Sequence, residues 1–221
     1  MSSKGGPDIN ENGLVLFLDA ANRLSYPGTG TTWTDLSGNG RNGTIVGPTY
    51  STLNGGAFLL NNNRIDLSGL TAFGPTQPHT YSVWIKFSSS SGTYMWVLNN
   101  GDNSRGDSLI VRYGDRIGYF YNGGASVNSG NLILNYNKWN NLCITYESGG
   151  AVKMYLNGVF DVGFNVTIST PVSNSGPRIG SWYNDGYGYT GYIANLMIYN
   201  RALSASEVLQ NFNALRGRYG V

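Results

Sequence analysis

The chain has 221 residues, a net charge of +2 and only 12% charged residues. Its Lys and Arg residues form no basic run, so the sequence gives no support for nucleic-acid binding. A single cysteine, Cys143 in the apolar run LCITY, excludes an internal disulfide and is expected to be a buried thiol.

The 32 glycines and 16 tyrosines, with few Lys and Glu residues, favour strands and turns over helices, and the length suits one large β domain. The N-terminal residues are polar and lack the apolar segment of a signal peptide. No stretch of the chain is long and apolar enough to span a membrane. We predict an N-terminal arm at residues 1–12, which could order on a partner, and one domain at residues 13–221.

Short apolar segments separated by turn residues predict a β-sandwich or a β-barrel. In chain order the predicted strands are residues 14–18, 57–60, 64–67, 79–87, 93–98, 108–113, 116–121, two within 138–160, 176–182 and 191–200. The second and third of these are expected to form a short hairpin around the Asn61–Asn63 cluster. Asn157-Gly158 predicts a tight hairpin turn, because type I′ turns need positive φ at both central residues.

The last predicted strand leads directly into a predicted helix. Along one face of the strand the apolar residues are Tyr192, Ala194, Leu196 and Ile198. Ser204 and Glu207 then have the spacing of a capping box, in which each side chain bonds a free backbone N–H. The helical stripe expected to pack on the sandwich consists of Val208, Phe212 and Leu215.

Residues 191–207 resemble the closing motif of laminin-G-like jelly rolls in the concanavalin A-like lectin/glucanase superfamily, G-x-I-D-x-[VLI]-x-[IV]-Y-N-R-A-L-S-x-x-E. The one departure is Ala194, where the family often has Asp. Residues 13–46 and 138–160 resemble two further motifs of this family, in the expected order. These two matches are carried by Leu18, Asp19, Trp33, Asp35, Ser37, Gly38, Asn39, Gly43, Trp139, Thr145, Tyr146, Gly150, Tyr155 and Gly158.

The resemblance implies an all-β fold, a two-sheet antiparallel β-sandwich (a concanavalin A-like jelly roll) with a short C-terminal helix. It says little about the ligand, because the superfamily contains lectins, adhesion modules, glycosidases and virion proteins. Residues 207–220 also resemble the terminus of laminin-G-like proteins in tailed phages of marine bacteria. This second resemblance implies a location on the surface of a phage particle, outside the cell.

Glycoside hydrolysis needs two carboxylates on either side of the scissile bond. The three glutamates, Glu11, Glu147 and Glu207, fall in the N-terminal arm, a predicted turn and the helix cap. No pair of acids has the spacing of neighbours on a predicted strand. The single histidine, His79, is expected at the surface or at a sheet edge, and no G-x-S-x-G motif accompanies it. We therefore predict that the protein is not an enzyme.

Asp35, Ser37 and Asn39 place oxygen donors at positions one, three and five of a loop with glycine at position six, as at the start of a calcium loop. Position twelve lacks a carboxylate, which excludes an EF-hand. The favoured alternative is a turn in which the Asp and Asn side chains cap backbone amides. The family resemblance implies a structural calcium bound by a carboxylate on the closing strand, where Ala194 stands here, and Asp19 is left as a contributor.

Two loops carry the side chains that we expect to contact a ligand. In the loop at residues 99–107 the candidates are Asp102, Asn103 and Arg105. In the loop at residues 181–189 the candidates are Trp182, Tyr183, Asn184, Asp185, Tyr187 and Tyr189. Aromatic faces stack on the C–H patch of a sugar ring while Asn and Asp bind its hydroxyls. The same composition is typical of a protein-binding loop, or of aromatic residues that pack a loop on a sheet.

These patterns predict a non-catalytic recognition or adhesion module on a virion surface, as a capsid decoration or tail-associated protein. The expected partners are a capsid or tail protein, a cell-surface glycan, or both, and self-association into a homo-oligomer is compatible with the sequence. The alternative is a free carbohydrate-binding lectin, and a glycoside hydrolase comes third. No cofactor is expected apart from the structural calcium described above.

Overall fold

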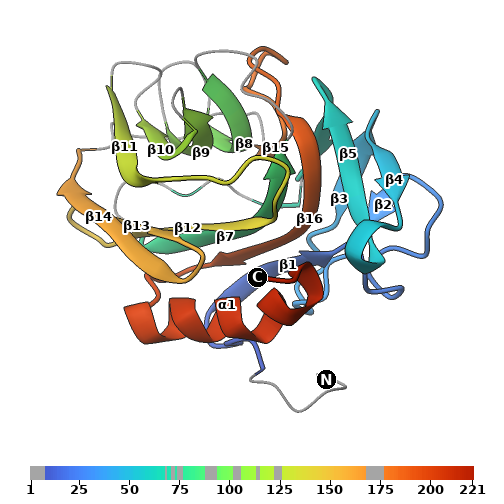
Figure 1. The fold of residues 1–221 in the computed structure, drawn as a ribbon, viewed down its shortest axis with the longest axis horizontal. Helices are drawn as coiled ribbons and strands as arrows, with labels where there is room; N and C mark the ends of the chain where they lie inside the picture. Colours follow the sequence, from blue (N-terminus) through green and yellow to red (C-terminus); the bar gives the residue numbers. More distant parts are fainter. Residues whose placement is uncertain are drawn as a thin grey trace.

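The computed structural model is a sandwich of two antiparallel β-sheets with one helix across its outer face (Figure 1). It describes residues 8–67, 69–70, 73, 77–87, 94–101, 106–112, 115–121, 126–167 and 177–221, with only the backbone at residues 126–129. The predicted all-β class with a C-terminal helix is confirmed. The helix found in the described part of the chain is too short and too polar to cross a membrane.

Each sheet contains eight strands. The order in sheet A is β14 (Val159–Asn165), β13 (Ala151–Leu156), β12 (Asn140–Tyr146), β7 (His79–Phe87), β16 (Thr190–Tyr199), β5 (Ala57–Asn61) and β4 (Thr49–Ser51), with β1 (Leu14–Asp19) paired to β16. The order in sheet B is β11 (Ser126–Ile133), β10 (Arg116–Tyr121), β9 (Gly106–Arg112), β8 (Tyr94–Gly101), β15 (Arg178–Ile179), β6 (Arg64–Asp66), β3 (Gly43–Val46) and β2 (Thr32–Trp33). A short 3-10 turn, η1 (Leu53–Gly55), precedes β5.

The main hydrophobic core lies between the two sheets, and the central strand β7 shows how the sequence builds it. The predicted strand at residues 79–87 is confirmed as β7, and its side chains alternate, with Tyr81, Val83, Ile85 and Phe87 in the core. Trp84 points to the opposite face of sheet A, where it joins a second hydrophobic cluster under the helix. One strand with period-two alternation therefore supplies two separate packing layers.

The predicted hairpin around residues 61–63 is wrong. β5 pairs with β16 in sheet A, whereas β6 pairs with β3 and β15 in sheet B. The chain crosses between the sheets next to Asn62, which has a φ of +56°. The predicted turn at Asn157-Gly158 is confirmed, since the two residues have φ values of +52° and +76° and join the paired strands β13 and β14.

The predicted alternation of the closing strand β16 is interrupted by a bulge. Its pairing with β7 shifts between Ile193 and Asn195. Ile193 and Leu196 face the main core, whereas Ala194 faces the cluster under the helix. Tyr192 and Ala194 therefore do not share a face with Leu196, because a bulge reverses the side-chain alternation beyond it.

The helix α1 (Ala205–Tyr219) begins at the predicted capping box. The Ser204 side chain accepts a hydrogen bond from the backbone of Glu207, and the Glu207 carboxylate accepts one from the backbone N–H of Ser204 at 2.8 Å. The predicted stripe is confirmed, because the helix packs on the outer face of sheet A through Val208, Phe212 and Leu215. Cys143 lies in the same cluster and is buried as expected.

Within the predicted N-terminal arm, residues 8–12 are bound to the helix and to β16. The backbone N–H of Asn10 donates to Asn211 Oδ1 at 2.7 Å, and the Asn10 side chain donates to Glu207 at 3.0 Å. The Tyr199 hydroxyl donates to the Asn10 carbonyl oxygen at 2.8 Å. These bonds join the two ends of the domain. Residues 1–7 lie outside the described residues.

The ion pair of Glu207 with Arg201 makes the stability of this junction sensitive to acid. Arg201 donates to both carboxylate oxygens, at 2.7 and 2.9 Å, and holds the pKa of Glu207 at about 2, below the ordinary value of 4.5. The contribution to stability is therefore complete above pH 4.5 and is lost as the pH falls toward 2. We expect Glu207→Gln to lower the urea midpoint of unfolding at pH 7 and to have little effect near pH 2. An equal loss at both pH values would contradict this assignment.

Candidate functional site

The outer face of sheet B carries a cluster of apolar and aromatic side chains. β8 alternates, so Met95 and Val97 enter the main core while Trp96 points outward. Ile110 of β9 and Phe120 of β10 lie beside Trp96 on this outer face. The rings of Phe120 and Trp96 meet edge-on at a centroid distance of 4.8 Å. Three neighbouring strands therefore build an apolar floor on the outside of the sandwich.

The loop at residues 180–189 lies over this floor. The N–H of Gly180 donates to the Val97 carbonyl oxygen, and the N–H of Trp96 donates to the Tyr187 carbonyl oxygen, both at 3.0 Å. The loop is thus bonded to β8 at two points. Asp185 and Tyr187 have φ values of +64° and +51°. Positive φ is uncommon for bulky residues, and such strain gathers at functional sites.

The loop stacks aromatic rings on Trp96. The Trp182 ring lies 5.3 Å from Trp96 at an interplanar angle of 26°, and the Tyr187 ring lies 5.2 Å from Trp96 at 41°. Tyr183 meets Trp182 edge-on at 4.8 Å. Tyr187 is 55% exposed although Trp96 beneath it is buried. We call Trp96, Trp182, Tyr183 and Tyr187 the aromatic platform.

A balanced network of charged side chains borders the aromatic platform. Arg64 of β6 contacts Asp66 at 3.0 Å and Asp185 at 2.9 Å. Arg178 of β15 contacts Asp185 at 3.1 Å and Asp66 at 4.0 Å. Arg178 also donates to the carbonyl oxygen of Tyr183 at 2.9 Å, which ties the network to the platform. The border therefore offers donors and acceptors without a net charge.

The structure brings together most of the residues predicted in this loop. The predicted residues that lie on the surface at or beside the platform are Trp182, Tyr183, Asn184, Asp185 and Tyr187. Asn184 Oδ1 accepts the N–H of Gly186 at 3.1 Å and so shapes the turn. Tyr189 is a correction, because it is fully buried in the main core and donates to the Tyr192 carbonyl oxygen at 3.3 Å. The candidates Asp102, Asn103 and Arg105 lie outside the described residues.

Sequence reasoning missed Trp96, Phe120 and the two arginines of the charged network. The outward position of Trp96 follows from the alternation of β8, so a signal for this residue was present. Arg64 and Arg178 come from strands that are far apart in the sequence and adjacent in sheet B. Their meeting depends on strand pairing, which no local pattern in the sequence indicates.

A second polar cluster lies inside the sandwich and corrects the prediction for His79. This residue was expected at the surface or a sheet edge, but its side chain is fully buried. Its Nε2 lies 2.8 Å from Asp107 Oδ2, and its Nδ1 lies 2.8 Å from the Gln77 carbonyl oxygen. The ring also stacks between Phe73 and Tyr146, at centroid distances of 5.0 and 4.9 Å. Hydrogen bonds at both ring nitrogens offset the free-energy cost of burying this polar side chain.

Asp107 is the acceptor at the centre of this cluster. Besides His79, the Tyr81 and Tyr119 hydroxyls donate to it at 3.0 and 2.8 Å, and the Asn100 amide donates at 2.6 Å. Burial raises the pKa of Asp107, but the charge of His79 and the hydrogen bonds outweigh burial and lower it below the ordinary value. Asp107 and His79 are closed to solvent, so we assign the cluster to stability rather than to ligand binding.

The loop predicted to resemble a calcium site is a turn organised by Asp35. Asp35 Oδ1 accepts the backbone N–H groups of Phe17 and Ser37, both at 2.9 Å, and Oδ2 accepts that of Arg41 at 3.0 Å. The Asn39 side chain donates to the Ser37 hydroxyl at 2.9 Å. Both Asp35 oxygens therefore face hydrogen-bond donors, the geometry expected of the alternative in which Asp and Asn cap backbone amides.

Asp19 takes part in a different contact. Its carboxylate pairs with Arg218 of α1 at 2.7 Å and accepts the N–H of Ala21 at 3.0 Å, so it fastens the end of the helix to β1. Across the described ranges, no group of three or more His, Cys, Asp or Glu side chains is placed to hold a metal ion. Calcium binding through Asp19, Asp35, Ser37 and Asn39 stays a prediction.

Two eight-stranded antiparallel sheets with a covering C-terminal helix define a concanavalin A-like jelly roll. Residues 59–209 match the family model described as the concanavalin A-like lectin/glucanases superfamily. The chain belongs to this superfamily. No curated protein matches the sequence.

Solved structures share the fold at low sequence identity. Domain 4 of AbnA, a GH43 extracellular arabinanase from Geobacillus stearothermophilus in complex with arabinotriose, is 22% identical with a TM-score of 0.68, over 90% of this chain and 98% of that domain. The binding domain of Paraclostridial Mosquitocidal Protein 1 is 20% identical with a TM-score of 0.69, over 92% and 52% of the two chains. Trypanosoma rangeli sialidase in complex with sialic acid is 15% identical with a TM-score of 0.70, over 98% and 36%. At this identity the likeness shows the fold alone.

Proposed function

We propose that the protein is a non-catalytic glycan-recognition module whose ligand binds on the aromatic platform. The observation that carries this proposal is the exposed Tyr187 ring, held on buried Trp96 next to a neutral set of Arg and Asp side chains. A rigid aromatic ring stacks on the apolar face of a sugar, and the neighbouring donors and acceptors bind its hydroxyls. Because stacking and backbone bonds fix the loop before binding, little ordering entropy is lost.

The comparisons support a saccharide ligand without identifying it. A domain with this fold has been solved in complex with arabinotriose. A sialidase solved in complex with sialic acid shares the fold over 36% of its chain. A toxin binding domain with the same fold is an equally similar neighbour, so a receptor protein is the competing ligand class. The balanced charge of the Arg–Asp network favours a neutral glycan over a strongly charged protein surface.

Our proposal that catalysis is absent rests on the state of the acids near the platform. A glycosidase needs one carboxyl group that keeps its proton and one that is ionised. Asp66 and Asp185 are each held by Arg64 and Arg178, so both carboxylates are already engaged in ion pairs. None of the three glutamates is in the platform or its charged border, since Glu147 pairs with Lys153, Glu207 caps the helix and Glu11 lies in the N-terminal segment bound to that helix.

We retain attachment to a phage particle as a finer proposal, supported by the sequence resemblance of residues 207–220. In this form the module lies on the virion surface, outside the cell, and binds a capsid or tail protein as well as a glycan. A free lectin has the same platform but no particle partner. Co-sedimentation with capsid or tail fractions separates the two, because only the virion protein is carried down with the particles.

The platform proposal predicts a specific loss of glycan binding. We expect Tyr187→Ala to reduce retention on a glycan array by about tenfold or more, the scale of a central aromatic anchor. The matched control is Tyr136→Ala, which removes another half-exposed tyrosine that packs on Phe87 rather than on the platform. Equal retention by wild type and Tyr187→Ala would overturn the proposal. Retention of a receptor protein in place of any glycan would favour the competing ligand class.

A further inference from the structure

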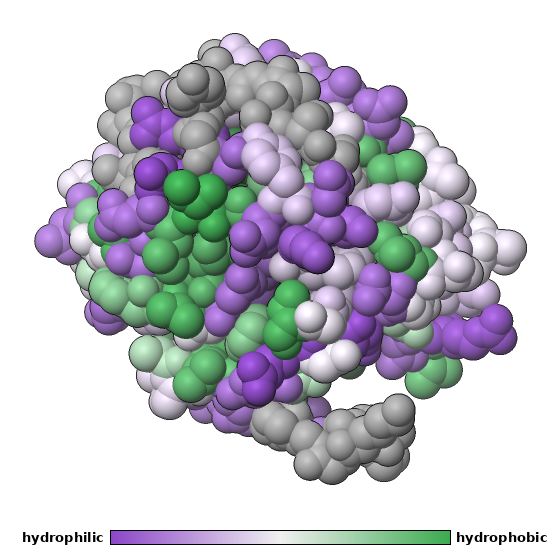
Figure 2. Space-filling view, in the orientation of Figure 1, coloured by the Kyte–Doolittle hydropathy of each residue, from purple (hydrophilic) through white to green (hydrophobic). Residues whose placement is uncertain are grey.

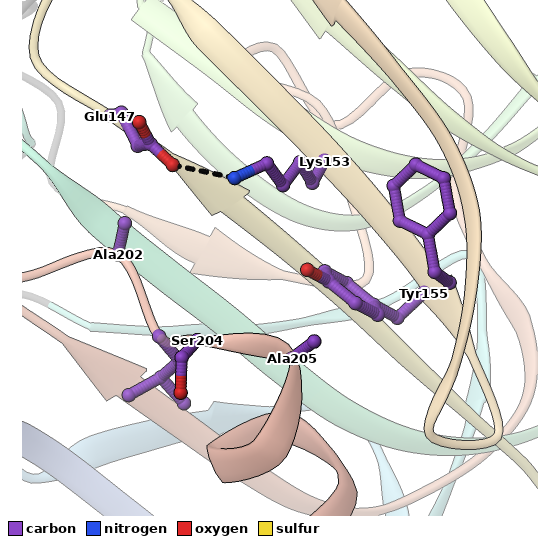
Figure 3. A pocket seen from close by; sticks show the side chains of 8 residues that line it. Glu147, Lys153, Tyr155, Ala202, Ser204 and Ala205 are labelled. Carbon is purple, nitrogen blue, oxygen red and sulfur yellow. Dashed lines mark hydrogen bonds and ion pairs between the residues drawn. The ribbon is translucent and has the colours of Figure 1, made fainter.

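A hollow of about 570 Å³ lies on the outer face of sheet A, on the other sheet from the aromatic platform (Figure 3). One wall consists of Glu147, Lys153 and Tyr155 from the β12–β13 hairpin and of Phe160 from β14. The opposite wall is the segment at residues 202–205, which leads from β16 into α1. A volume of this size is in the range of small-ligand pockets.

The polar groups of the hollow are arranged for a ligand that both donates and accepts. The Tyr155 side chain is only 2% exposed, its hydroxyl points into the hollow, and it has no hydrogen-bond partner within the described part of the chain. Beside it, Lys153 Nζ and Glu147 Oε1 lie 2.8 Å apart, and both side chains are about half exposed. A buried aromatic residue normally satisfies its hydroxyl. The Tyr155 hydroxyl is not among the buried unpartnered atoms of the described residues, so it is accessible from the hollow to water or to a ligand hydroxyl.

The apolar part of the hollow is an exposed aromatic ring. Phe160 is 53% exposed and meets Tyr155 edge-on at 5.7 Å, so it is supported from behind while one side is open. Hydrophobic side chains gather over β13, β14 and the nearby edge of sheet B in Figure 2. The exposed apolar residues of β14 and β11 include Val159, Phe160 and Ile133. The hollow therefore has an apolar side, formed by the Phe160 ring, and a polar side, formed by Lys153, Glu147 and the Tyr155 hydroxyl.

We infer that this hollow is a second saccharide site, which takes one or two neutral sugar rings. A sugar has an apolar C–H face for Phe160 and hydroxyls that both donate and accept, as Glu147, Lys153 and Tyr155 require. The charges of Glu147 and Lys153 cancel, so the hollow has no preference for an anionic sugar. With the platform on sheet B, one molecule would hold glycans on both sheets of the sandwich, which raises avidity for a surface with many glycans.

The test is binding to immobilised neutral oligosaccharides, arabinotriose among them. We expect Phe160→Ala to lower retention of a subset of them by about tenfold, and Tyr155→Phe, which removes only the hydroxyl, by about threefold to tenfold. The control Val159→Ala removes a neighbouring side chain that is 59% exposed and does not line the hollow, and it should retain every sugar. Melting curves of all variants check that each one folds.

The outcomes separate the two sites. Sugars lost with Phe160→Ala and kept with Tyr187→Ala support the hollow even if the platform proposal fails. Sugars that depend on Tyr187 alone overturn the hollow and leave the platform standing. A wild-type protein that retains no neutral sugar overturns the hollow as well. A dimer in light scattering that Phe160→Ala dissociates would also overturn it, because the exposed ring would then contact a second copy of the chain.

Discussion

Replacing Asp107 with asparagine is expected to lower the free energy of unfolding by about 3–5 kcal/mol, the cost of removing one partner from a buried ionic cluster. The groups that converge on this carboxylate are His79 Nε2, Tyr81 Oη, Tyr119 Oη and Asn100 Nδ2. A carboxylate accepts at both oxygens, whereas an amide has one acceptor oxygen and two N–H donors. In the variant at least one buried donor would face another donor, and His79 would lose its carboxylate partner.

Urea unfolding at pH 7, followed by tryptophan fluorescence, measures this loss. The matched control is Asp66→Asn, which removes a carboxylate of the same size from a partly exposed ion pair with Arg64. Exposed pairs contribute about 0.2–1 kcal/mol, so the control should lose far less stability than Asp107→Asn. If the two variants lost the same amount, the buried cluster would not be the stabilising element described here.

Replacing Trp84 with alanine is expected to lower the free energy of unfolding by about 3–5 kcal/mol. Trp84 is fully buried between sheet A and α1. Its ring stacks on Tyr219 at 4.1 Å with an interplanar angle of 22°, and on Phe212 at 5.6 Å with an angle of 12°. Alanine would leave a cavity under the helix, and both helix rings would lose the surface on which they pack.

The same helix supplies the control for Trp84→Ala. Leu209 is 45% exposed and lies outside the buried stripe, so Leu209→Ala should change the free energy of unfolding by less than about 1 kcal/mol. Far-UV circular dichroism of Trp84→Ala should also show whether the helical signal weakens before the sandwich unfolds. A loss in Trp84→Ala as small as that in Leu209→Ala would show that the helix does not depend on this contact.

Local patterns in the sequence predicted the structural features that depend only on residues a few positions apart. The capping box at Ser204 and Glu207 and the turn at Asn157-Gly158 follow from local hydrogen bonding and from backbone φ preferences. The alternation of apolar residues along β7 likewise determines that Trp84 lies on the face opposite the main core. The composition of the loop at residues 181–189 predicted most of the aromatic platform, because exposed rings and turn-forming residues occur there together.

Features that depend on partners far away in the sequence could not be predicted. The apolar runs of β5 and β6 look like two strands of a hairpin, and only pairing with β16 and β3 sends them to different sheets. A histidine such as His79 is polar and would be expected at the surface. It can be buried here because Asp107, which is distant along the chain, is its hydrogen-bond partner inside the sandwich. In sequence, Tyr189 looks like its neighbour Tyr187. In the structure, its N–H donates to the Gly180 carbonyl oxygen and its ring lies in the main core.

The most direct test of glycan recognition by the platform is to observe the tryptophan indole N–H signals by NMR while the best-retained oligosaccharide is added. The chain has five tryptophans, so five indole signals report on separate places in the fold. We predict that the signals of Trp96 and Trp182 shift while those of Trp33, Trp84 and Trp139, which lie in the main core or under the helix, stay in place. Unchanged signals of Trp96 and Trp182 at saturating oligosaccharide would contradict the platform as the binding site.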